Sequence, residues 1–112
     1  MLSMAADPSE VVLSADQMCD LWFALDIEGQ IKRNELLRLD FPGRPAGAKY
    51  EEPAGTLNYM AHIFSVAPGG QRTLVATAHW FRRPDGSVGA SGFLDPKSIL
   101  DGGTWYVVPE KD

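Results

Sequence analysis

With 112 residues, of which 45% are hydrophobic, the chain has enough apolar material for one core and no room for a second domain, so we expect one small domain over residues 1–112. Fifteen acidic against ten basic residues give a net charge of −5, which disfavours direct nucleic-acid binding, because that affinity comes mainly from clustered Lys and Arg. The single cysteine, Cys19, excludes an intrachain disulfide and fits a reducing cytoplasm.

Residues 1–12 are predicted to form a flexible tail, because Pro8 and small residues dominate them. Their start carries neither a positive charge cluster nor an apolar stretch, so we expect no signal peptide. No run in the chain approaches the ~20 apolar residues that cross a bilayer. We therefore expect a cytoplasmic protein that does not bind membranes.

A helix is predicted to begin directly after Ser14. Ser14 as the N-cap and Gln17 three residues later form the capping-box signature. The apolar residues that follow at helical spacing, expected to pack on a sheet, are Met18, Leu21, Trp22 and Leu25. Gly29 suits the position after a helix C-terminus, which would end the helix near residues 26–28.

Two large apolar residues of this helix, Phe23 and Ile27, lie outside the apolar stripe. Either another segment of the chain or another chain should cover them. The next stretch, residues 30–41, is compatible with a strand or a helix, and we favour a strand because Leu37, Leu39 and Phe41 alternate with polar residues. Residues 42–55 have the proline and glycine content of a loop.

An antiparallel hairpin is the clearest element of the sequence, with strands over residues 56–66 and 72–82. A four-residue loop over 67–70 would place Val66 opposite Gln71. The face expected to be buried carries Leu57, Tyr59, Ala61, Ile63, Leu74, Ala76, Ala78 and Trp80. The other face, which is richer in apolar groups than a solvated face needs, carries Asn58, Met60, His62, Phe64, Val66, Thr73, Val75, Thr77, His79 and Phe81.

The remaining elements are a turn over residues 83–87, a short strand over 87–92, a capped helical turn over 95–100 and a last strand over 104–108. Asp95 as N-cap and Pro96 at the first helical position favour the helical turn. Together these elements predict an α+β domain in which one N-terminal amphipathic helix packs on a mainly antiparallel sheet of about four to five strands.

No group of residues has the pattern of a catalytic, metal or cofactor site. In the expected register His62 and His79 lie four residues apart along the strands, on the order of 13 Å, which is too far for one metal ion. Cys19 has no neighbouring base, and the glycine-rich residues 84–92 lack the Lys-Ser/Thr of a phosphate-binding loop. We expect no cofactor and favour a protein that is not an enzyme.

The first functional hypothesis is therefore a non-catalytic binding or regulatory protein, such as an accessory subunit or inhibitor, that binds another protein or itself as a homo-oligomer. The candidate interface residues are Phe23, Ile27, Met60, Phe64, Val75 and Phe81. A second hypothesis is a small-molecule or enzymatic site on the open sheet face, formed by His62, His79, Tyr50 and Arg82. A third is an acidic inhibitor of a nucleic-acid-binding protein, based on the acidic residues near the first helix.

Overall fold

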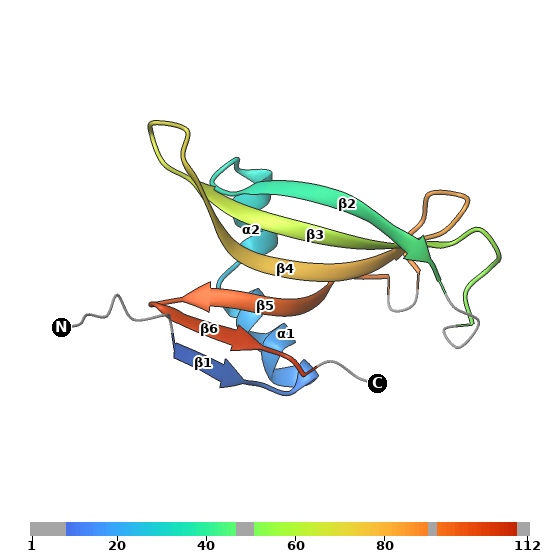
Figure 1. Cartoon of the computed structure of the whole chain (residues 1–112), viewed down its shortest axis with the longest axis horizontal. Coiled ribbons are helices and arrows are strands. Elements are labelled where there is room, and N and C mark those ends of the chain that lie inside the picture. Colours follow the sequence, from blue (N-terminus) through green and yellow to red (C-terminus); the bar gives the residue numbers. More distant parts are fainter. Residues whose placement is uncertain (1–8, 47–50, 90–91, 110–112) are drawn as a thin grey trace.

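The computed structural model describes residues 9–46, 51–89 and 92–109. Within these ranges the chain is α+β, with a six-stranded mixed sheet and two helices (Figure 1). The elements are β1 (Ser9–Val12), α1 (Ala15–Ala24), α2 (Ile27–Lys32), β2 (Leu37–Pro45), β3 (Leu57–Val66), β4 (Arg72–Arg82), β5 (Asp95–Asp101) and β6 (Thr104–Val107). The strand order is β1-β6-β5-β4-β3-β2, and every neighbouring pair is antiparallel except β1 and β6, which are parallel.

The predicted start of the first helix is confirmed. The Ser14 hydroxyl accepts the N–H of Gln17 at 3.1 Å, and the Gln17 side chain accepts the N–H of Ser14 at 2.9 Å. The predicted end is wrong, because α1 stops at Ala24 and Asp26 takes the left-handed conformation at φ 51°. Asp tolerates this conformation better than most residues, so the break falls there.

Gly29 lies inside α2 instead of ending α1. A Cβ at this position would meet the carboxylate of Asp26, an exposed side chain that would have to turn away. The first part of the expected strand over 30–41 is also helical, up to Lys32. The strand begins only at Leu37, and β2 continues to Pro45, into residues expected to form a loop.

Both strands of the predicted hairpin are confirmed, but its register is wrong. The N–H of Ala67 donates to the carbonyl of Gln71 at 2.8 Å, which shortens the loop to three residues and places Val66 opposite Arg72. Gly70 supplies the positive φ, 88°, that a three-residue hairpin loop requires.

A bulge in β4 changes the register a second time. Ile63 pairs with Ala76 and Phe64 with Leu74, so Val75 is the extra residue. Leu74 therefore shares the face of Phe64, whereas Val75 packs against the core. The predicted faces of Leu74 and Val75 are consequently exchanged.

The expected helical turn over residues 95–100 is wrong, because these residues form β5. Pro96 lies opposite Ala78, where the β4–β5 register shifts, and such an irregularity tolerates a residue without an N–H. Gly102 and Gly103 have φ of 58° and 81° and form the two-residue connection between β5 and β6. The strand expected over residues 87–92 is absent from the described part of that segment. There, Val88 forms only an isolated bridge with Arg82.

The expected tail also contains a strand. Residues 9–12 form β1, whose backbone pairs with β6, and the hydroxyls of Ser9 and Thr104 hydrogen-bond at 3.1 Å. Residues 1–8 lie outside the described part of the chain. The last predicted strand is confirmed as β6.

Both helices lie on the same side of the sheet (Figure 1). They meet it through the buried core residues Met18, Trp22, Ile27, Ala61, Ile63, Ala76, Ala78 and Ile99. Leu21 and Leu25 pack against this cluster, so all four residues of the apolar stripe contribute to the core or its border. Among the described residues, neither helix is long and apolar enough to cross a membrane.

Candidate functional site

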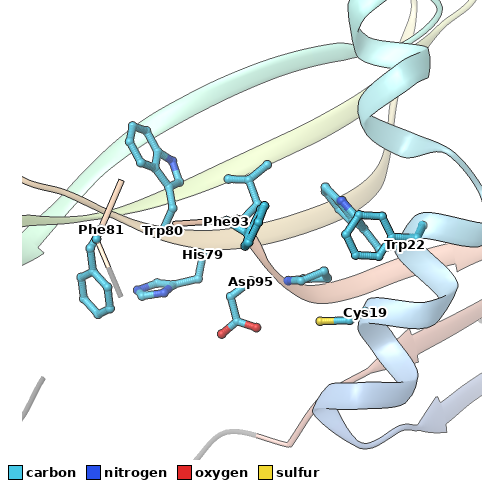
Figure 2. A pocket seen from close by; sticks show the side chains of 11 residues that line it. Cys19, Trp22, His79, Trp80, Phe81, Phe93 and Asp95 are labelled. Carbon is cyan, nitrogen blue, oxygen red and sulfur yellow. The ribbon is translucent and has the colours of Figure 1, made fainter. Parts of the chain in front are cut away.

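An open pocket of about 510 Å³ lies between α1, the end of β4 and the start of β5 (Figure 2). Its walls are mainly apolar and aromatic. The lining residues are Cys19, Trp22, Phe23, His79, Trp80, Phe81, Gly89, Phe93, Leu94, Asp95 and Pro96. The volume lies within the ~300–1,000 Å³ that small-molecule sites occupy in proteins.

The pocket exists because β4 is longer than its pairing with β5. The last pair is His79 with Asp95, and β4 continues from there to Arg82. Side chains from both faces of β4 consequently line the pocket, although Trp80 and Phe81 point to opposite sides of the strand (Figure 2). The helix α1 supplies a second wall, and Gly89 and residues 93–96 complete the lining.

Fixed contacts hold the aromatic side chains of β4. The indole N–H of Trp80 donates to the Asp40 carboxylate at 3.0 Å, and its ring contacts Tyr59 with the ring centroids 4.9 Å apart. The rings of Phe81 and His79 meet edge to face, with centroids 4.8 Å apart. These contacts preorganise the rings for a ligand.

The rim of the pocket carries Phe23 from α1 and Phe93 from the segment before β5. Their exposed fractions, 66% and 68%, are the highest of the exposed large apolar side chains in the described part of the chain. Burying one Phe side chain is worth about 1.5–3 kcal/mol, so two phenylalanines exposed on the rim of one pocket favour binding of an apolar group.

Two polar side chains in the pocket have shifted pKa values. Burial lowers the pKa of His79, Lys97 lowers it further, and Asp95 acts in the opposite direction. The imidazole is therefore neutral at pH 7 and offers one donor and one acceptor. Burial raises the pKa of the Cys19 thiol, as do Asp95, Asp16 and Asp20, so the weakly nucleophilic protonated form prevails.

The structure does not bring together the four residues of the predicted small-molecule site. His79 lines the pocket, but His62 is not a lining residue and instead contacts Phe41, with the ring centroids 4.8 Å apart. His62 pairs with Thr77, so the two histidines are offset by two residues and not by the predicted four. Arg82 is exposed at the end of β4, and Tyr50 lies outside the described residues.

The predicted interface residues also separate. Ile27 is 3% exposed and Phe81 7%, so other parts of the same chain cover them, and Val75 packs against the core. Phe23 is exposed at the pocket, whereas Met60 and Phe64 are half-buried on the sheet face opposite the helices. The six residues therefore do not form one surface.

Sequence reasoning missed the contribution of residues 93–96. The expected helical turn left Phe93 and Leu94 without an assignment, although an apolar pair that follows a glycine-rich segment is a usable signal for a packed or binding position. The sequence analysis assigned Trp80 to the buried face of the sheet and not to a pocket. Nothing in the sequence indicates that β4 extends beyond its pairing with β5.

Among the described residues, no group of three or more His, Cys, Asp or Glu is arranged to hold a metal ion. Comparisons with models of protein families, with curated proteins and with solved structures find no match for this chain.

Proposed function

We propose that this protein is a non-catalytic binding protein whose aromatic pocket holds a small molecule with an apolar body. The observation that carries the proposal is the position of Phe23 and Phe93, both strongly exposed on the rim of a pocket lined by Trp22 and Trp80. An isolated exposed phenylalanine needs no explanation, but two at one aromatic pocket indicate a place where water is displaced.

A binding role agrees with the chemistry of the pocket. The Cys19 thiol is protonated and half-buried, and the neutral His79 is already held against Phe81. A nucleophile would need a thiolate or a base that generates one. Neutral hydrogen-bonding groups beside an apolar wall suit the orientation of a bound ligand.

The indole N–H signals of the three tryptophans test this function. A library of small aromatic compounds is added to the protein labelled with ¹⁵N, and amide and indole shifts are followed by NMR. We expect hits that move the signals of Trp22 and Trp80, which line the pocket, and leave that of Trp105, which does not line it.

The matched variants are Phe23→Ala, on the rim, and Phe41→Ala, on β2 outside the pocket. Both phenylalanines are exposed, so both variants should fold. Phe23→Ala should weaken every hit about tenfold, since loss of a phenyl contact costs roughly 1–2 kcal/mol, and Phe41→Ala should not. A library without hits at Trp22 and Trp80, or equal binding by both variants, would refute the proposal.

A second candidate function is protein binding at the sheet face opposite the helices. Phe41 is exposed there, and Met60 and Phe64 are half-buried beside it, although no described helix covers this face. The partner would be a second copy or another protein. Sedimentation at micromolar to millimolar concentration tests the first case, and a strict monomer throughout would exclude a homo-oligomer.

A further inference from the structure

The sheet has one long edge without a neighbour. β2 is the last strand beside β3, and in the described part of the chain no further strand pairs with it (Figure 1). The unpaired N–H and C=O groups of an edge strand are a template for another strand, and proteins usually keep such edges short. The other edge, β1, has four residues, whereas β2 has nine and is exposed from Asp40 onward. β2 is therefore the edge that can hold a partner strand.

Prolines limit the pairing surface of β2 to its first part. Pro42 and Pro45 have no N–H to donate, and the β2–β3 register shifts between them. The five residues before Pro42 pair with β3 without interruption. They are Leu37, Arg38, Leu39, Asp40 and Phe41. A partner strand would add its hydrogen bonds along this stretch.

Apolar and charged side chains alternate along these five residues. Leu37, Leu39 and Phe41 lie on the sheet face away from the helices, because they pair with residues of β3 on that face. Arg38 and Asp40 lie on the other face and form an ion pair at 3.0 Å, with side chains that are 29% and 32% exposed. Two opposite charges therefore stand two residues apart on one face of the edge.

Trp80 fixes the two charges. Its indole N–H donates to the Asp40 carboxylate at 3.0 Å, and the Arg38 guanidinium carbon lies 5.5 Å from the centroid of its ring. Both side chains are thus already placed, so a partner strand does not have to order them. Charges on an edge usually prevent pairing with other chains. Here the two signs alternate, which excludes most strands but not one with the matching order.

A second copy of β2 has the matching order in one antiparallel register. With Leu39 opposite Leu39 of the second copy, Arg38 lies opposite Asp40 of that copy, and the reverse pair forms on the other side of the two-fold axis. The same register places Leu37 opposite Phe41 twice, so every cross-strand pair is either apolar or of opposite charge. A register centred on Arg38 or Asp40 would place like charges opposite each other. The strand is therefore complementary to itself in this register.

We propose that two copies of this chain associate through antiparallel pairing of their β2 edges, with Leu39 at the two-fold axis. A two-fold axis perpendicular to the sheet keeps the helices of both copies on the same side, so the open faces join into one surface. Phe41, which is 47% exposed, then contacts Leu37 of the second copy. The inference rests on the second candidate function, for which it names the partner and the contact, and it does not depend on the aromatic pocket.

Sedimentation velocity from micromolar to millimolar concentration tests the association. We expect a reversible dimer with a Kd on the order of 100 μM, because five paired residues on each copy make an interface smaller than the ~1,200–2,000 Å² of stable complexes. Amide signals of the protein labelled with ¹⁵N locate the contact. Those of residues 37–41 should move as the concentration rises, and those of β1, the other edge, should stay constant.

Exchange of the two charges tests the register. In Arg38→Asp acidic residues would face acidic residues of the second copy, and in Asp40→Arg basic residues would face basic ones. Each variant alone should dimerise at least about fivefold more weakly than the natural chain. An equimolar mixture of the two variants again places opposite charges at both cross-strand pairs, so it should recover the association of the natural chain. Recovery also shows that both variants fold.

Arg72→Asp and Asp101→Arg are the matched controls. Both residues are exposed and lie outside β2, and the substitutions change the net charge by the same amounts as the two β2 variants. Each control should dimerise like the natural chain, and mixing the two should add nothing. Equal weakening by these controls would show that overall charge decides the association, which overturns the proposed pairing.

The remaining outcomes separate the edge pairing from the other proposals. A strict monomer at millimolar concentration overturns the edge pairing together with the homo-oligomer of the second candidate function, and leaves the pocket unaffected. A dimer that both β2 variants form as readily as the natural chain, or a mixture that does not recover the association, overturns the edge pairing only. Shifts in β1 instead of residues 37–41 overturn it as well.

Discussion

The two faces of the sheet differ where α1 packs on β3 and β4. Where the helices pack, β3 and β4 present Ala61, Ala76 and Ala78, all fully buried. On the opposite face the same strands and β2 present Phe41, His62 and other large groups that contact one another, and there no helix of the described chain covers them.

The physical reason is the space that a second layer needs. Small side chains let Trp22 and Met18 of α1 reach the sheet, where they fill the core together with Ile63 and Ile99. On the uncovered face the large side chains shield the strands themselves. Small side chains at these three positions therefore mark where Trp22 and Met18 pack on the sheet.

The largest effect should follow from removing the bulk that fills the covered face. Trp22→Ala should lower the free energy of unfolding by about 3–5 kcal/mol, because it leaves a cavity against the buried alanines. Phe41→Ala, on the open face, should cost about 1 kcal/mol, since its site is already half in water. Urea unfolding measures both values, and similar costs would contradict the distinction between the faces.

Adding bulk beneath the helices should have the next largest effect. Ala78→Leu should destabilise the fold by about 1–3 kcal/mol, because the helices would have to move away from β4. Thr73→Leu, at an exposed position of the same strand, should change stability by no more than about 0.5 kcal/mol. A tolerated Ala78→Leu would mean that small residues are not required on the covered face.

A smaller effect is expected at the start of the covering helix. Ser14→Ala removes the acceptor of the Gln17 N–H and should cost about 1 kcal/mol. For a domain of this size the loss corresponds to a fall of roughly 4 to 8 °C in Tm. Thr73→Ala, an exposed hydroxyl on β4, serves as the control in calorimetry. Equal melting of the two variants would show that the cap does not support the helix layer.

The smallest effect concerns His79. Unlike Ala78, it lies on the sheet face away from the helices, yet it is partly buried. The unfolded imidazole takes up a proton near its ordinary pKa of ~6.5, whereas burial lowers the pKa of His79 in the folded protein. The unfolded state therefore binds more protons. This contribution to stability is fully present above about pH 6.5 and is lost as the pH falls below it.

The variant His79→Gln should consequently flatten the dependence of unfolding free energy on pH between about pH 7 and pH 5. Urea unfolding at several pH values measures this slope for the variant and the natural chain. Parallel slopes would show that His79 is as hydrated as in the unfolded chain.

Interactions within a few residues along the chain were predictable. The capping box joins Ser14 and Gln17, which are three residues apart. The backbone preferences of Pro68 and of the glycines that follow it favour a hairpin loop at that point. Phe23 was recognised as an apolar residue outside the buried stripe by helical spacing alone.

Pairing between distant segments decided the rest. Asp95 and Pro96 have the local signature of a helix start, yet β4 on one side and β6 on the other offer strand partners to residues 95–101, and the ladder hydrogen bonds outweigh the local preference. The bulge at Val75 and the extension of β4 beyond β5 likewise arise between strands. The sequence alone determined where the first helix begins and where the central hairpin turns, because those contacts are local, whereas the pocket formed only when the tertiary structure placed α1, β4 and residues 93–96 side by side.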